Sequence, residues 1–92
     1  MSVLIHVPAP LRKLTGGKAR VEAGGATVRE LIDQLDQEYN GMGAKLVDEN
    51  RGIHPYINIY VNDEDIRFLD GMDTRLQEGD TISIVPAMAG GH

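Results

Sequence analysis

The sequence predicts an α+β fold in which a small mixed sheet of four to five strands packs on one main helix. Short segments with alternating apolar residues lie on both sides of a single segment with helical apolar spacing. The chain has 92 residues, which is enough for one domain with one modest core. Apolar residues (41%) and charged residues (25%) occur in the proportions of an ordinary globular domain, so extensive disorder is not expected.

The first two strands are predicted at residues 3–7 and 18–22. Both segments alternate apolar and more polar residues, as a strand with one buried face does. Two prolines follow the first segment closely, remove backbone donors and end the strand. Residues 11–17 are predicted to be a loop in which Gly16-Gly17 reverses the chain, so that the two strands form a hairpin with a long connection.

The main helix is predicted to begin at Thr27. Thr27 and Glu30 have the spacing of a capping box, in which the two side chains satisfy free amides of the first helical turn. Asn40-Gly41 is a stop signal after the last turn. Between these signals, apolar residues recur every three or four positions and form one stripe. The stripe consists of Val28, Leu31, Ile32, Leu35 and Tyr39.

The second half of the chain supplies the remaining strands. After the main helix, Leu46-Val47 is expected to anchor a short helical turn. Residues 56–62 alternate and are predicted to form a strand, with a short return strand at residues 66–68. The last strand is predicted at residues 81–85, where the following proline stops it.

This order of elements, two hairpins around one helix, describes a β-grasp (ubiquitin-like) roll in which the first and last strands pair in the centre. The helical stripe then covers one face of the sheet, and Val85 remains as an outward apolar residue. The predicted inward set is Val3, Ile5, Val7, Val21, Val28, Leu31, Ile32, Leu35, Ile57, Ile59, Val61, Ile82 and Ile84.

The chain end is predicted to be a flexible tail, residues 87–92, that follows a β-grasp domain of residues 1–86. Gly90 and Gly91 have no Cβ atom, so their backbone fits a slot too narrow for other residues and can bring a carboxylate to a reacting centre. A frayed terminus is the alternative interpretation of the same composition.

Composition excludes several functions. The net charge of −5 argues against a nucleic-acid interface, which needs clustered Lys and Arg. The absence of cysteine excludes a disulfide framework and a thiolate zinc site. No apolar run approaches the ~18 residues of a membrane span, and no leader is recognisable, so a cytoplasmic location without membrane partners is expected.

No arrangement of residues for self-contained catalysis is visible, so the chain is not expected to be an enzyme. The three histidines are far apart and form no helical ligand pair, so no metal site is predicted. His6 is expected on a strand surface and His54 in a loop. The acidic run Asp63-Glu64-Asp65 lacks the pattern of a calcium loop and is interpreted as a solvated turn.

Several motifs along the whole chain carry a resemblance to a known family. They are Leu11-Arg12 with Thr15-Gly16-Gly17, the run from Asn58 to Phe68, the segment from Glu78 to Ile82, and the end from Pro86 to Gly91. With these motifs the chain resembles the ubiquitin-like sulfur carriers of the MoaD/ThiS family. The run from Asn58 to Phe68 is most similar to the CysO-like branch, which serves cysteine biosynthesis.

The resemblance implies a protein cosubstrate that binds no cofactor itself. An E1-like (MoeB/ThiF-type) enzyme would use ATP and magnesium to adenylate the Gly91 carboxylate, and a sulfur donor would convert the adenylate to a thiocarboxylate. A cysteine synthase that depends on pyridoxal phosphate would receive the sulfur, and a JAMM-type zinc peptidase would release the cysteine. The residues implied in partner binding are Gly90, Ala89, Met88 and Val85.

His92 departs from the family pattern. Adenylation needs a terminal glycine carboxylate, and a histidine side chain does not fit a slot shaped for glycine. His92 is either native and removed by a peptidase, which we expect, or a remnant of an expression vector. Three rival functions stay open: the small subunit of molybdopterin synthase, a protein modifier that forms isopeptide bonds through Gly91, and a β-grasp interaction module with an inert tail.

Overall fold

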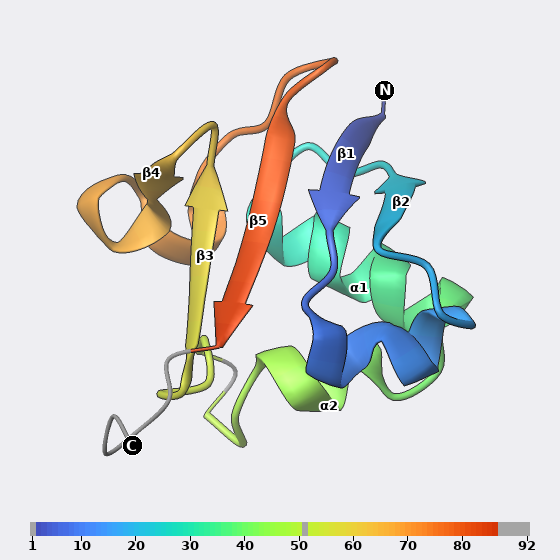
Figure 1. Cartoon of the computed structure of the whole chain (residues 1–92). Coiled ribbons are helices and arrows are strands. Elements are labelled where there is room, and N and C mark those ends of the chain that lie inside the picture. The colour runs from blue at the N-terminus through green and yellow to red at the C-terminus, as the bar shows by residue number, and fades with distance from the viewer. Residues whose placement is uncertain (1, 51, 87–92) are drawn as a thin grey trace.

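The computed structural model describes residues 2–50 and 52–86, which fold into a sheet with helices on one face (Figure 1). The helices are α1 (Val28–Glu38) and α2 (Met42–Leu46), and three 3₁₀ helices are η1 (Ala9–Thr15), η2 (Ile66–Phe68) and η3 (Gly71–Asp73). The strands are β1 (Val3–His6), β2 (Arg20–Ala23), β3 (Ile57–Val61), β4 (Glu64–Asp65) and β5 (Thr81–Pro86). None of the helices in the described ranges is long and apolar enough to cross a membrane.

The strands form one mixed sheet in the order β2-β1-β5-β3-β4. The first and last strands are parallel neighbours in the centre, with Ile5 opposite Ile82, while the other pairs are antiparallel. This arrangement confirms the predicted β-grasp roll. β5 pairs with β1 over residues 81–83 and with β3 over residues 82–86, so its backbone is held up to Pro86, which pairs with Ile57.

The start of α1 follows the predicted capping box. The Thr27 hydroxyl accepts a hydrogen bond from the Glu30 amide at 3.3 Å, which satisfies one free donor of the first turn. The Glu30 carboxylate reaches back to the amide of Ala26 at 3.0 Å. At the other end, the helix stops at Glu38, and Gly41 adopts a φ of 99° that glycine tolerates without strain. Local signals in the sequence thus determine both ends of the helix.

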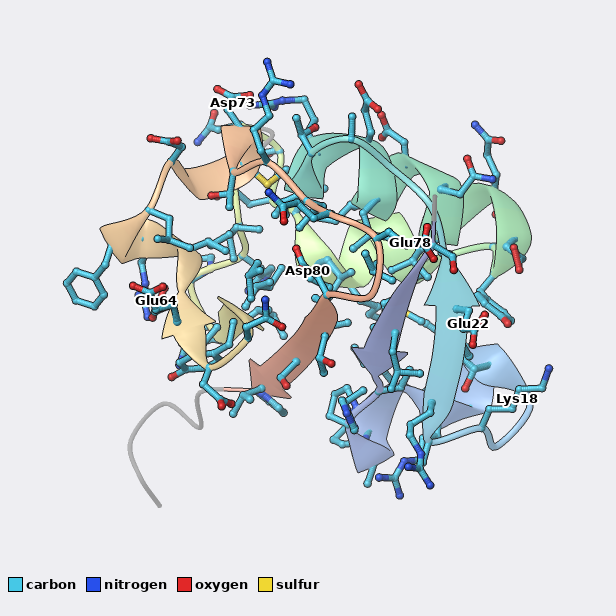
Figure 2. The ribbon with its side chains drawn as sticks, turned by 90° about the horizontal axis from the view of Figure 1, so that it is seen from above. Lys18, Glu22, Glu64, Asp73, Glu78 and Asp80 are labelled. Atoms are coloured by element: carbon cyan, nitrogen blue, oxygen red, sulfur yellow. The ribbon has the colours of Figure 1, made fainter. Side chains whose placement is uncertain are left out.

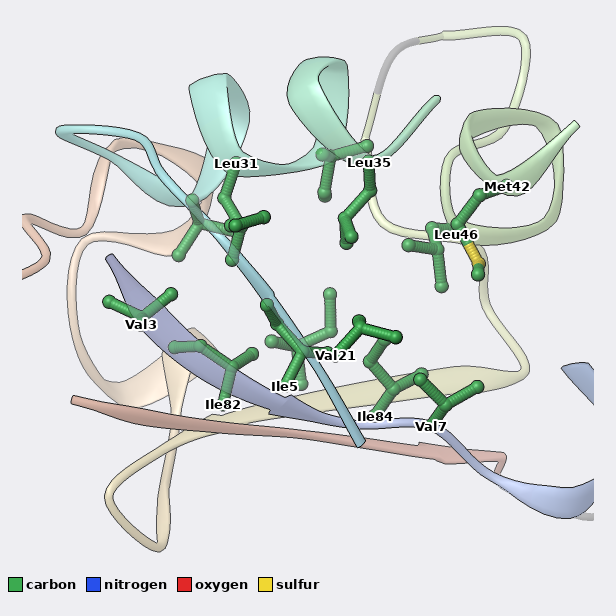
Figure 3. Packing of buried hydrophobic residues seen from close by; sticks show 14 of the residues in the cluster. Val3, Ile5, Val7, Val21, Leu31, Leu35, Met42, Leu46, Ile82 and Ile84 are labelled. Atoms are coloured by element: carbon green, nitrogen blue, oxygen red, sulfur yellow. The ribbon is translucent and has the colours of Figure 1, made fainter. Parts of the chain in front are cut away.

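The core lies between the inner face of the sheet and the helices, where side chains of β1 and β5 face those of α1 and α2 (Figure 3). The predicted inward set is confirmed except for Ile57, which is partly buried and packs against this core. Leu46 is buried at the end of α2, as expected for the anchor of a short helical turn. The other buried apolar residues outside the predicted inward set are Leu11, Ala23, Met42, Ile66 and Leu76.

The prediction of a loop at residues 11–17 is wrong, because residues 9–15 form η1. The prolines end β1 as expected, but a proline in the first turn of a helix loses no hydrogen bond, since that amide has no helical partner. The short helix then carries Leu11 into the core. Gly16 and Gly17 still reverse the chain, with φ angles of 69° and 90°.

The predicted return strand is displaced. Residues 66–68 form η2, and the strand that pairs with β3 is Glu64–Asp65. Asn62 and Asp63 adopt φ angles of 50° and 74°, so the turn occupies only two residues and pairing resumes at once. The Asp65 carboxylate then accepts a hydrogen bond from the amide of Arg67 at 2.8 Å, which starts η2 and ends the strand.

We expect Gly25→Ala to destabilise the domain by about 1–3 kcal/mol. A Cβ atom at Gly25 would lie 2.6 Å from the backbone nitrogen and 2.9 Å from the Cα atom of Leu31, and helical backbone cannot move away as a flexible side chain can. Urea denaturation measures the change. Gly52→Ala is the control, because its Cβ would meet nothing closer than 4.0 Å. Equal midpoints for the two variants would contradict this prediction.

Candidate functional site

The candidate site is the outward face of β5, the strand that leads to the diglycine. Ile82 and Ile84 are buried, so alternation places Ser83 and Val85 on the opposite face of the sheet. Val85 is 41% exposed, which is unusual for a large apolar side chain on a central strand. The structure therefore confirms the outward position predicted for Val85. This residue is the last but one of β5, directly before Pro86.

A polar network lies directly beside Val85. Asn58 is the β3 residue opposite Val85, and its side-chain oxygen accepts a hydrogen bond from Nη2 of Arg67. Arg67 is also held by Asp65, with Nη2 2.8 Å from Oδ2 and Nε 3.2 Å from Oδ1. We call these four residues the outer-face cluster: Asn58, Asp65, Arg67 and Val85.

The electrostatics of the outer-face cluster favour its charged form. Hydrogen bonds from the side chain and backbone amide of Arg67 lower the pKa of Asp65 below its ordinary value. The same carboxylate raises the pKa of Arg67. A depressed carboxylate pKa keeps the pair intact above the ordinary pKa of an aspartate, and protonation breaks it only at more acidic pH. Asp65 and Arg67 are therefore both ionised at neutral pH.

Sequence reasoning did not identify Asn58, Asp65 and Arg67 as a cluster, although all three belong to the run that carried the family resemblance. Alternation along residues 56–62 places Asn58 outward, and that signal was available. The position of Arg67 depends on the two-residue turn and on η2, which the sequence pattern did not reveal. Within the acidic run, Asp63 is in the turn, whereas Glu64 and Asp65 form β4 and Asp65 binds Arg67.

The predicted residues of the tail lie outside the described residues: Met88, Ala89, Gly90, Gly91 and His92. Their assigned roles in activation, partner binding and processing stay predictions, as does the division of the chain after residue 86. The site that the structure does define is the surface from which that tail departs.

The other polar groups considered in the sequence do not join this site. His6 is exposed on β1 and His54 accepts a hydrogen bond from the amide of Tyr56 at 3.2 Å in its loop. Glu78 and Asp80 lie in the loop before β5 (Figure 2), where they accept hydrogen bonds from backbone amides of Ser2 and Gln77. Within residues 2–50 and 52–86, no three His, Asp or Glu side chains are grouped so that they could hold a metal ion.

A groove of about 470 Å³ lies on the helical side of the molecule. Ile32 of α1, Val47 and Met72 contribute apolar atoms, and Asp33 and Asp36 contribute charge. The helices cover the inner face of the sheet, so this groove and the outward face of β5 are on different sides of the domain. It contributes nothing to the surface around Val85.

A β-grasp fold whose last strand exposes an apolar residue and is followed in the sequence by a diglycine defines a ubiquitin-like protein. The sequence profile of the ThiS family matches residues 5–91, and the chain belongs to this family. The match ends at Gly91, one residue before His92. The predicted resemblance to MoaD/ThiS carriers is thereby confirmed.

Two relatives and one solved structure are similar to the chain over nearly its whole length. The sulfur carrier protein CysO of Mycobacterium tuberculosis is 42% identical over 93 residues, covering 99% of this chain and 100% of the relative. The small archaeal modifier protein 3 of Haloferax volcanii is 35% identical over 94 residues, with coverage of 99% and 100%. A chain of the Amycolatopsis orientalis BexX/CysO complex matches the structure with a TM-score of 0.91 at 48% identity, covering 97% of this chain and 99% of that one.

Proposed function

We propose that the chain is a sulfur carrier for cysteine biosynthesis whose reacting group is the carboxylate of Gly91. The observation that carries the proposal is the geometry of β5: a strand in the centre of the sheet, paired with β3 up to Pro86, exposes Val85 a few residues before the diglycine in the sequence. A rigid strand with an apolar anchor positions a short arm for a partner enzyme. The full-length similarity to the sulfur carrier protein CysO supports sulfur as the cargo, and cysteine as the product follows from the resemblance to the CysO-like branch.

The chemistry begins with an unreactive carboxylate. One oxygen of the Gly91 carboxylate attacks the α-phosphate of ATP on an E1-like enzyme, pyrophosphate leaves, and an acyl adenylate forms. A sulfide equivalent then displaces AMP and leaves a thiocarboxylate on Gly91. The carrier supplies the carboxylate, the narrow Gly90-Gly91 backbone and the docking surface, while ATP, magnesium and the reacting side chains belong to the activating enzyme.

The later steps use other partners. A synthase that contains pyridoxal phosphate would hold an activated serine derivative, and the thiocarboxylate sulfur would form the new C–S bond to its β-carbon while the activating group leaves with the side-chain oxygen. The acyl group moves from sulfur to the amine, and a JAMM-type zinc peptidase hydrolyses the resulting amide, which restores the Gly91 carboxylate and frees cysteine. We propose that the same type of peptidase removes His92 before the first cycle, since both cuts follow a diglycine.

A protein modifier is the second candidate function, and the similarity to small archaeal modifier protein 3 favours it. A modifier would use the same adenylate but transfer the Gly91 acyl group to a lysine amine. Two products therefore separate the candidates after incubation of the chain ending at Gly91 with ATP, magnesium, sulfide and the activating enzyme. A carrier gains the mass of sulfur in place of oxygen, whereas a modifier is joined through Gly91 to lysines of other proteins added to the incubation. After trypsin digestion such a lysine carries residues 76–91, because Arg75 is the last basic residue before the diglycine.

We expect Val85→Asp to lower the rate of adenylation at limiting carrier concentration by about tenfold or more, because a buried apolar anchor contributes about 2 kcal/mol to an interface. Pyrophosphate release by the activating enzyme measures the rate. Val85→Ile is the matched control, since it preserves the apolar contact, and a thermal unfolding curve of each variant checks the fold. An Asp variant that folds and reacts like the original chain would show that Val85 is not an anchor.

A further inference from the structure

The outer-face cluster contains an exposed cation whose position is fixed before any partner binds. Resting on the proposed function, we propose that Arg67 is a second anchor on the docking surface and binds a carboxylate of the E1-like activating enzyme, next to the pocket that receives Val85. The partner surface is thus defined as an apolar pocket with an acidic residue at its border.

The sheet register places Arg67 beside Val85. Asn58 and Val85 are directly opposite on β3 and β5, and such antiparallel pairs have Cβ atoms about 5 Å apart. Both side chains point to the outward face. Nη2 of Arg67 donates to the side-chain oxygen of Asn58. The guanidinium group is therefore bound to the side chain that is the direct neighbour of Val85 across the strands. One partner surface can therefore contact both residues at once.

Arg67 is ordered by contacts within the domain. The Asp65 side chain is only 10% exposed and is itself fixed, because its Oδ1 atom accepts the amide of Arg67 at 2.8 Å. Asp65 and Asn58 then hold the guanidinium group from two sides. A free arginine loses rotamer entropy when it binds a partner, and Arg67 has already lost most of it on folding.

The guanidinium group keeps unused donors. Its contacts with described residues use Nε and Nη2, while Nη1 has no hydrogen-bond partner within the described ranges. The side chain is 63% exposed, so a partner atom can reach it. A guanidinium donates hydrogen bonds and accepts none, and its strongest partner is a carboxylate. Asp65 takes the edge formed by Nε and Nη2, and Asn58 accepts from Nη2 as well, which leaves the hydrogens of Nη1 for that carboxylate.

A second arginine pair in the same chain offers a contrast. Arg29 on α1 has a single acceptor atom, Oδ1 of Asp73, at 3.3 Å, and the Asp73 side chain is 76% exposed. This pair is an ordinary surface contact with little preorganisation. Arg29 is on α1, which covers the inner face of the sheet, whereas Val85 is on the outward face. Arg29 is therefore a matched control for Arg67: the same residue type, also paired with an aspartate, but on the other face.

The test is the steady-state kinetics of adenylation, with the carrier ending at Gly91 as the varied substrate of the activating enzyme. We expect Arg67→Ala to raise the KM for the carrier about tenfold with little change in kcat, because the chemistry takes place at the Gly91 carboxylate and not at Arg67. Arg29→Ala should leave both constants unchanged. Arg67→Lys should restore only part of the loss, since an ammonium group lacks the planar set of donors that Asp65 and Asn58 hold in place.

Further arms make each result decisive. Asp65→Asn keeps Arg67 but loosens it, so a smaller rise in KM is expected, and added salt should bring the original chain closer to Arg67→Ala. Equal KM values for the original chain and a folded Arg67→Ala variant overturn the inference, as does an effect seen only with the synthase. If the unsubstituted carrier ending at Gly91 is not adenylated at all, the proposed function itself is wrong. That result is distinguishable from equal KM values, which contradict only the role of Arg67.

Discussion

The chain that ends at Gly91 is expected to form a thiocarboxylate with the activating enzyme, ATP and sulfide, whereas the chain that ends at His92 is expected to form none. The reason is steric and chemical at once. In the longer chain the Gly91 carbonyl is part of a peptide bond, and the only terminal carboxylate belongs to a residue with a Cβ atom and an imidazole ring. Intact-mass measurement of both chains after the same incubation gives the answer.

The peptidase completes this experiment. After treatment with a JAMM-type zinc peptidase, the longer chain should lose the mass of one histidine residue and then become a substrate for activation. A chain ending at Gly91 with Gly90→Val is the control for the narrow slot, and it should stay unmodified although its terminal carboxylate is free. Activation of the untreated chain ending at His92 at the same rate would refute the requirement for processing.

Elements whose signals are local were predictable from the sequence. For α1, the capping residues, one apolar stripe and a glycine after the last turn all agree, and the structure confirms each of them. The topology followed from the alternation of the strands and from the single helix that had to cover them. Val85 could be placed outward because alternation along β5 has only two possible phases, and Ile82 and Ile84 require one of them.

Features that depend on tight turns and register were not predictable. Asn62 and Asp63 adopt positive φ angles without a glycine, so the return strand began earlier than its apolar residues suggested. The contact between Arg67 and Asn58 joins residues nine positions apart in sequence, and it exists because that turn and η2 fold the chain back beside β3. A sequence pattern that describes one segment at a time therefore cannot predict this contact.

Ile5→Ala is expected to lower the free energy of unfolding by about 2–5 kcal/mol, which is a large part of the ~5–15 kcal/mol that holds a small domain together. Ile5 is fully buried and lies opposite both Val21 of β2 and Ile82 of β5. Its loss leaves a cavity at the middle one of the three residue pairs that join β5 to the first hairpin. Urea denaturation measures the change, and the midpoint should fall with little change in slope.

His6→Ala is the control for Ile5→Ala, because His6 follows in the same strand but points outward and is exposed. Its effect should stay within about 0.5 kcal/mol, as for most surface substitutions. The contrast also separates stability from docking: at a temperature where Ile5→Ala is still folded, its KM with the activating enzyme should match that of the original chain, since the outer-face cluster is on the other face. A similar loss of stability in both variants would mean that β1 is held by its backbone pairing and not by the packing of Ile5.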